Sequence, residues 1–320
     1  MLRNVVDYFQ RLSSGFGQGW TRFWFTPSDP ATLSAIRLCT GLVVVYLHAT
    51  LLFDLIAFFG PNGMLPADEI APLSGATFSY LNFLSQPAEL WAVHLVGLAV
   101  LVMFAVGFWT RVTTVLALVV FLSDINRAPM ITSLTEPIAA MVLLYLCLAP
   151  SGRYFSVDAW LARRKRPSVA DPDAANRPST FATIATRLIQ VHLALLIAMM
   201  GFSKINSEVW WIGTGMWWLM ARPESRLVDV TGLYRWPKLI DAWTHVIVLF
   251  ELVFPLLVWV PLARPLLLGI GVFVWGSIAL VTGDLTFALM MCIASLAYVS
   301  PSTLRACCQR SEPVAVPNAA

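Results

Sequence analysis

The sequence predicts an all-α integral membrane protein, a polytopic helical bundle of about eight transmembrane helices. Hydrophobic residues make up 58% of the 320 residues and charged residues only 12%, about half the charged share of a typical soluble domain. The mean hydropathy of +0.73 agrees with this composition. Several stretches reach the roughly 20 apolar residues that a helix needs to cross a bilayer, so we expect one membrane domain and no separate soluble domain.

The apolar runs set the order of the predicted helices. The expected spans lie at about residues 31–58, 88–108, 112–125, 134–150, 186–205, 243–261, 265–282 and 285–300. Together they form a transmembrane domain over residues 29–303. The last residues, 304–320, are expected to be a disordered tail.

The first 28 residues are too polar to span a membrane. Trp20 lies close to Arg22 in residues 1–28, a mixture of aromatic and basic side chains that is typical of an amphipathic helix at the level of the lipid headgroups. Asp29 and Pro30 then mark the start of the first span, because Asp caps free amides and Pro suits the first helical turn.

Two longer connections separate the spans. Residues 151–182 carry the basic run RRKR at 163–166 and then a stretch rich in Pro, Asp, Ala and Asn, which predicts a mobile cytoplasmic linker. Residues 206–242 contain two tryptophan pairs seven positions apart, beginning at Trp210 and Trp217. This spacing favours a short helix at the outer interface of the membrane.

The distribution of Lys and Arg predicts the orientation. With eight spans and a cytoplasmic N-terminus, most basic residues fall on the cytoplasmic side, as the positive-inside rule requires. Both termini are then cytoplasmic, as in a multi-pass protein of a bacterial inner membrane. In this arrangement the basic stretch 222–238 lies on the outer side, which is an exception to the positive-inside rule.

Ionisable side chains inside the spans need a structural or functional reason, because burying them in a bilayer is costly. Arg37 and His48 are 11 residues apart in the first span and share one helical face, while Gly41 allows another helix to approach. For Arg37, pairing with an acid or with backbone carbonyls is favoured over binding a ligand.

Lys204 ends the fifth span on the predicted outer side. It either extends to the headgroups or, if buried, serves as a base. His192 lies 12 residues earlier, about 18 Å away along a helix, so it cannot share a proton with Lys204 and is expected to make a structural hydrogen bond.

Other polar groups near the predicted outer surface would line one outward-facing cavity with Lys204. These are Asp124, Arg127, Glu136, His245 and Glu251. The simpler alternative for each is solvation at a helix end or an interhelical pair. Glu251 is the exception, because it lies in an otherwise apolar segment and needs a partner.

The sequence lacks the motifs of several common catalytic and metal-binding sites. The five cysteines show no metal-type spacing, and neither a zinc nor a haem site is expected. The sequence contains no GxSxG, HExxH, P-loop or GxGxxG motif. The basic run at 163–166 has no aromatic residues between its charges, which favours anionic headgroups over nucleic acid.

Three stretches in order along the chain resemble HTTM-domain proteins, the bacterial relatives of the vitamin K-dependent gamma-carboxylase. They are FTPSDP at 25–30 followed by AIRL at 35–38 and Gly41, then SVD at 156–158, then Gly201 and Lys204 followed by Trp210 and Gly213. The resemblance covers about residues 15–300. It implies the fold of that family.

The resemblance also implies an activity. In the carboxylase, a lysine on the outer side is linked to oxidation of reduced vitamin K, and the strong base so formed removes a proton from a glutamate before CO2 adds. Lys204 looks like that lysine. This chain departs from the carboxylase in three ways: Ser203 precedes Lys204 where the carboxylase has adjacent lysines, Thr135-Glu136 replaces an expected histidine, and no large lumenal domain follows the last span.

Two hypotheses follow. The first is a membrane enzyme with at most a gamma-carboxylase-like lyase or epoxidase activity, acting on a reduced quinone or vitamin K-like lipid with Lys204 as base and Glu136 and His245 as helpers. The second is a non-enzymatic subunit for binding, transport or assembly, which would use the same cavity together with the bilayer, a quinone or a periplasmic protein.

Overall fold

The computed structural model describes residues 2–60, 62–64, 78–84, 86–127, 129–165, 177–223 and 226–309. Within these ranges the chain is α-helical, and its only β-type pairing is an isolated bridge between Ser28 and Ser179. The all-α class predicted from the sequence is therefore confirmed. Parts of the predicted linker 151–182, of the Trp-rich segment 206–242 and of the tail 304–320 lie outside the described residues.

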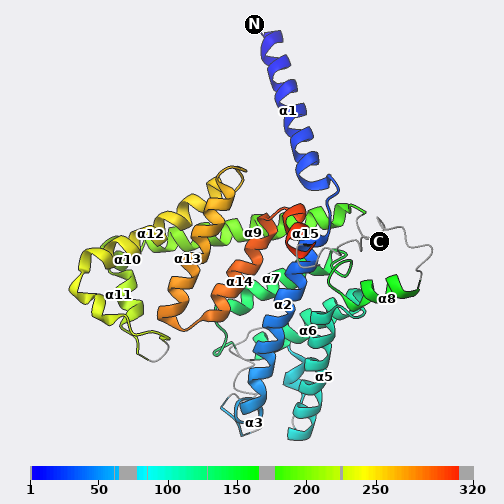
Figure 1. Ribbon diagram of the computed structural model, residues 1–320, viewed down its shortest axis with the longest axis vertical. Helices are drawn as coiled ribbons and strands as arrows, with labels where there is room; N and C mark the ends of the chain where they lie inside the picture. Colours follow the sequence, from blue (N-terminus) through cyan, green and yellow to red (C-terminus); the bar gives the residue numbers. More distant parts are fainter. Residues whose placement is uncertain are drawn as a thin grey trace, which may run out of the picture.

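Helices of very different length make up the bundle (Figure 1). The α-helices are α1 (Leu2–Phe25), α2 (Ala31–Thr50), α3 (Leu55–Phe59), α5 (Pro87–Val106), α6 (Thr110–Arg127), α7 (Thr135–Cys147), α8 (Val157–Lys165), α9 (Thr180–Ile205), α10 (Glu208–Trp211), α11 (Gly215–Met220), α12 (Pro237–Leu257), α13 (Arg264–Thr282), α14 (Leu285–Ser295) and α15 (Pro301–Gln309). Short 3-10 helices cover Leu51–Asp54 (η1), Tyr80–Phe83 (η2), Thr231–Arg235 (η3) and Leu296–Tyr298 (η4).

Five of the described helical segments are long and apolar enough to cross a membrane: Ala31–Phe59, Pro87–Val106, Thr180–Ile205, Pro237–Leu257 and Arg264–Thr282. The sequence predicted about eight. The remaining three coincide with α6, α7 and α14. α7 has 13 residues, which rise only about 20 Å, less than the roughly 30 Å of a hydrocarbon core.

The positions of the predicted spans agree with the helices, but some ends differ. α9 begins at Thr180, several residues before the expected start near residue 186, and α8 lies within the segment expected to be a linker. The predicted boundary of the tail at residue 304 falls inside α15.

Standard end signals explain where several helices start and stop. At α2, Asp29 Oδ1 accepts from the amide of Ala31 at 2.9 Å, as the sequence predicted. α5 begins with a capping box from Gln86 and Glu89 and ends at Gly107, which has a left-handed φ of 75°.

The tightest contact between α2 and α5 depends on a glycine. A Cβ atom at Gly41 would lie 2.6 Å from the Cα atom of Ala105, so no larger residue fits there without moving the backbone. Beside this contact, Arg37 is fully buried and donates from Nη1 to the carbonyls of Phe104 at 2.8 Å and Ala105 at 3.0 Å. Arg37 therefore joins α2 to the carboxyl end of α5 and is a structural residue.

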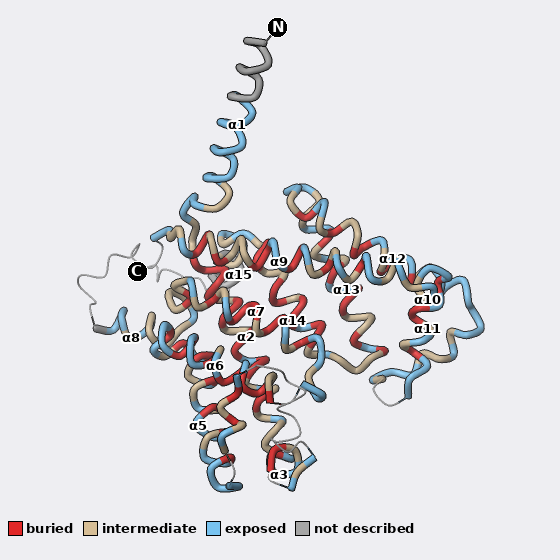
Figure 2. Tube along the Cα trace, turned by 180° about the vertical axis from the view of Figure 1, so that it is seen from behind, coloured by how far each residue is buried: buried red, intermediate tan, exposed pale blue. Residues whose placement is uncertain are grey.

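α1 projects away from the bundle (Figure 1), and its residues 11–22 are exposed (Figure 2). Its last turn is anchored to the bundle, where the guanidinium of Arg187 lies 4.3 Å from the ring centroid of Phe23. The exposed part carries Phe16 and Trp20, whose rings lie 6.2 Å apart. The position of this helix at the membrane interface stays a prediction.

Candidate functional site

Lys204 and Glu251 form a buried ion pair between α9 and α12. Lys204 Nζ lies 2.7 Å from Oε1 and 2.8 Å from Oε2 of Glu251, so it bonds to both carboxylate oxygens. The side chain of Glu251 is fully buried and that of Lys204 is 14% exposed. Glu251 thus has the partner that its apolar surroundings require.

The sequence brings these two side chains together through a close helix contact. A Cβ atom at Gly201, one turn before Lys204, would lie 3.2 Å from the Cβ atom of Glu251 and 3.1 Å from a methyl group of Leu252. The small residue lets α9 and α12 approach closely enough for the ammonium group to reach the carboxylate.

Trp210 covers the other side of the ammonium group. Its ring centroid, on α10, lies 5.0 Å from Lys204 Nζ, within range of a cation–π interaction. Lys204 also lies in the last turn of α9, where a positive charge is stabilised by the helix dipole. These contacts stabilise the charged pair in the resting protein.

A groove runs along α9 from this pair. It has a volume of about 610 Å³, within the usual range for small-molecule sites. We call it the lysine groove, and its lining residues are Leu134, His192, Leu195, Leu196, Met199, Met200, Ser203, Lys204 and Trp210. Its apolar wall and polar end suit an amphipathic molecule.

His192 lies in the lysine groove on the side away from Lys204 along α9. Its Nδ1 atom is 2.9 Å from the hydroxyl of Tyr145 on α7. The structural hydrogen bond expected from the sequence is therefore present. The bond joins α7 to α9 beside the groove.

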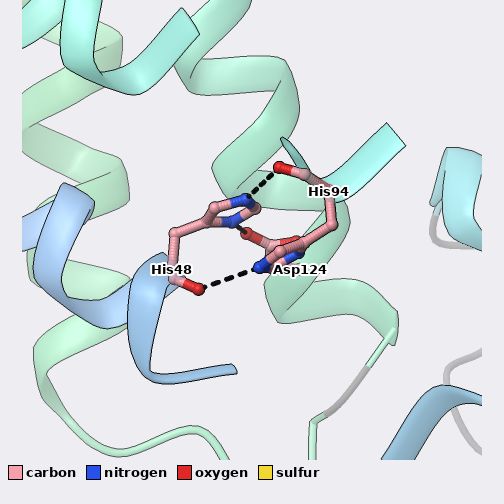
Figure 3. A group of neighbouring side chains, drawn as sticks. All are labelled: His48, His94 and Asp124. Carbon is pink, nitrogen blue, oxygen red and sulfur yellow. Dashed lines mark hydrogen bonds and ion pairs between the residues drawn. The ribbon is translucent and has the colours of Figure 1, made fainter. Parts of the chain in front are cut away.

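A second polar group is buried between α2, α5 and α6 (Figure 3). We call His48, His94 and Asp124 the histidine cluster. Each histidine is 1% exposed, and Asp124 is 8% exposed. His48 Nδ1 lies 2.6 Å from Asp124 Oδ2. The two imidazole rings stack with centroids 3.8 Å apart.

Each histidine of the cluster also bonds to the backbone of the other. His48 Nε2 lies 3.1 Å from the carbonyl oxygen of His94, and His94 Nε2 lies 3.1 Å from the carbonyl oxygen of His48. A Cβ atom at Gly97 would lie 3.2 Å from His48 Nε2, so this glycine makes room for the stacked rings.

The segment 78–84, before α5, packs against α6 near Asp124. Ser79 Oγ donates to the carbonyl of Ser123 at 2.8 Å, and Asn126 Nδ2 donates to the carbonyl of Phe78 at 2.8 Å. Burial, and then the negative charge of Asp124, raise the pKa of Tyr80 in this segment. Arg127 is buried one turn after Asp124, with its guanidinium 5.5 Å from the ring centroid of Phe59.

The single cavity expected from the sequence divides into separate groups in the structure. Of the residues expected in that cavity, Glu251 pairs with Lys204, whereas Asp124 pairs with His48 in a different region. Glu136 accepts from the amide of Ser133 at 2.7 Å and so closes a local turn before α7. His245 Nδ1 lies 2.8 Å from Asp241 Oδ1, one turn earlier on α12. No hydrogen bond or ion pair joins Glu136 or His245 to Lys204 within the described residues.

The roles of two residues, His94 in the histidine cluster and Trp210 beside Lys204, are not predicted from the sequence. The sequence does not link His94 to His48 and Asp124, and it predicts Trp210 only as part of a short helix at the outer interface. An isolated histidine in each of two apolar helices was the available signal for the histidine cluster. Comparison with known proteins gives no match to any family model, curated protein or solved structure.

Proposed function

We propose that this chain is an HTTM-like multi-pass protein of a bacterial inner membrane that binds a reduced quinone-like lipid in the lysine groove and oxidises it. The observation that carries the proposal is the position of the Lys204–Glu251 pair at the end of an apolar groove of about 610 Å³. Following the predicted orientation, this end faces the periplasm and both termini are cytoplasmic.

The groove matches the two parts of such a lipid. Leu195, Leu196, Met199 and Met200 offer an apolar wall for an isoprenoid tail, and Met side chains adapt to irregular ligands. The aromatic head would lie beside Trp210 and within reach of Lys204. An aromatic side chain and one charged group are a usual combination for fixing the orientation of a ligand.

The pair supplies a base once its proton moves to the carboxylate. The Lys204 amine then accepts a proton from a hydroquinone hydroxyl, while Glu251 keeps the transferred proton. The hydroquinone anion reacts with O2: one oxygen atom forms the epoxide of the quinone, and the other leaves as water with the two hydrogens of the hydroquinone. Lys204 is therefore the catalytic residue of this proposal.

The test uses purified protein in nanodiscs with a reduced naphthoquinone and O2, and follows epoxide formation by chromatography. Lys204→Ala removes the base. Lys204→Arg keeps a cation for Glu251 but cannot act as a base, because a guanidinium group does not deprotonate in proteins. Lys238→Ala is the matched control, since Lys238 is an exposed lysine at the start of α12.

Epoxide from the wild type and Lys238→Ala, but not from the two Lys204 variants, is the expected result. If folded wild-type protein makes no epoxide although reduced quinone is present, the proposal that the protein oxidises the quinone is wrong. Helical content by circular dichroism and a single peak in gel filtration establish that each variant is folded.

The same pair supports a second candidate, a non-enzymatic binding subunit. Lys204 already has two carboxylate contacts and an aromatic neighbour, so it is fully satisfied without chemistry. Glu136, at the position of the expected histidine, is bonded to Ser133 and does not reach Lys204. Saturable binding of the naphthoquinone without turnover, weakened by Trp210→Leu, would favour this candidate.

A further inference from the structure

The hydrogen bonds of the histidine cluster define which ring nitrogens carry protons. A backbone carbonyl only accepts, so the Nε2 atoms of His48 and His94 must each donate to the carbonyl of the other residue. The Nδ1 atom of each ring is then the one that can present a lone pair. Histidines that bind metals usually hold their other ring N–H against such an acceptor, which fixes the ring and its tautomer.

Asp124 provides the third possible metal ligand, and one of its carboxylate oxygens has no hydrogen bond among the described residues. Its Oδ1 atom is buried and has no hydrogen-bond partner among the described residues. A buried carboxylate oxygen without a donor is costly, unlike Oδ2, which bonds to His48. This oxygen is therefore available as a ligand atom for a cation beside the cluster.

The donor atoms are close enough for one ion. Atoms from His48, His94 and Asp124 lie within 4.8 Å of one another, and this is the only such set among the described residues. A tetrahedral ion with bonds near 2.0 Å places its ligand atoms about 3.3 Å apart. The widest separation in the cluster, at most 4.8 Å, must therefore shorten by at most about 1.5 Å, and the 2.6 Å between His48 Nδ1 and Asp124 Oδ2 must lengthen by about 0.7 Å. Both changes are within the reach of small side-chain rotations.

We propose that His48 Nδ1, His94 Nδ1 and the Asp124 carboxylate bind one divalent transition-metal ion. The ion replaces the proton that lies between His48 Nδ1 and Asp124 Oδ2, and that proton is released to solvent. Two imidazoles and one carboxylate suit Zn2+ or Fe2+ and do not suit the hard ions Ca2+ and Mg2+.

Three protein ligands leave a coordination position open. A water or hydroxide completes the shell, as in metal sites that keep a non-protein ligand. Arg127 is buried one turn further along α6 and adds positive charge to this region. An anionic fourth ligand such as hydroxide therefore balances the charge better than neutral water.

The experiment titrates metal-free, full-length protein in nanodiscs with Co2+ and records the visible d–d absorption, then measures bound Zn2+ by elemental analysis. The wild type is expected to bind one equivalent of either ion. His94→Gln and Asp124→Asn should lower the affinity at least about 100-fold, since loss of an outer-shell partner alone costs 10–100-fold. Asp124→Asn keeps the shape of the side chain and an acceptor for His48, so it is expected to fold.

His245→Gln is the matched control. It also removes a histidine paired with an aspartate, Asp241, but one that is 51% exposed. Retention of the single tight site in His245→Gln, with its loss in folded Asp124→Asn and His94→Gln, supports the proposal. Absence of a stoichiometric cobalt signal in the wild type, its persistence in the folded cluster variants, or its loss in His245→Gln would overturn it.

Discussion

The Lys204–Glu251 pair and the histidine cluster are both charged groups held between helices, but they differ in access. Lys204 is 14% exposed and borders a groove of about 610 Å³, whereas the side chain of His48 is fully buried between α2, α5 and α6. The first region can therefore receive an amphipathic molecule. The second can receive only a small ion, so burial of charge alone does not identify the kind of ligand.

The largest expected effect comes from separating the Lys204–Glu251 pair. Lys204→Met leaves the fully buried Glu251 carboxylate without its cation and should cost about 3–5 kcal/mol of stability, as for other buried pairs. Glu251→Leu should cost less, because Lys204 can extend to the headgroups. Thermal unfolding in detergent measures both.

The double variant Lys204→Met/Glu251→Leu is the control for this prediction. It removes both charges, so its stability should exceed that of Lys204→Met alone. Equal stability of all four proteins would mean that the pair carries no buried charge.

In the histidine cluster, His48→Leu should cost about 2–3 kcal/mol. It removes the donor to the carbonyl of His94 and the donor to Asp124 and leaves both acceptors buried. Unfolding of metal-free protein measures the loss. Asp124→Asn, which keeps an acceptor for His48, should lose clearly less; if it loses more, the charge of Asp124 rather than its hydrogen bond stabilises the region.

Substitutions of one glycine in each region test how tightly the helices of that region pack. A Cβ atom at Gly97 would meet a His48 ring held by hydrogen bonds, so Gly97→Ala should destabilise the protein by about 1 kcal/mol. A Cβ atom at Gly201 would lie 3.1 Å from a methyl group of Leu252, 3.2 Å from the Cβ atom of Glu251 and 3.3 Å from the backbone carbonyl carbon of Glu251, so Gly201→Ala should also destabilise the protein by about 1 kcal/mol. Thermal unfolding in which only one of the two variants is destabilised would show that the helices of the other region can move apart without cost.

The smallest effect is expected at Asp158, which belongs to neither region. Burial raises the pKa of Asp158, but bonds from Thr110 and Trp109 and the charge of Arg37 outweigh it, so the pKa is below its ordinary value of 3.8. Its stabilisation is present above that value and is lost as the pH falls through the lower, folded-state pKa. Thermal unfolding between pH 2 and 6 should show a shallower decline for Asp158→Asn than for the wild type.

The sequence predicted the class of fold and several local features. The cap at Asp29, the structural role of Arg37 and the need of Glu251 for a partner all follow from the cost of unpaired polar groups, and the structure contains each of them. The number of spans was less predictable, because α7 and α14 are apolar but too short to cross a bilayer unaided.

The grouping of the polar residues could not be predicted. His48 and Asp124 are separated by 76 residues, and Lys204 and Glu251 by 47. Periodicity places each side chain on a face of its own helix but does not say which helices pack together. The sequence therefore predicts one cavity where the structure has separate groups.

The most direct test of the difference between the regions is to locate the quinone. A photoreactive naphthoquinone analogue is bound to the protein in nanodiscs, irradiated, and mapped by peptide mass spectrometry. We predict labelling within residues 195–210 that excess naphthoquinone suppresses, and none on α2, α5 or α6 near His48. Suppressible labelling beside His48, or labelling that excess naphthoquinone does not suppress anywhere, would contradict the assignment of the lysine groove as the binding site.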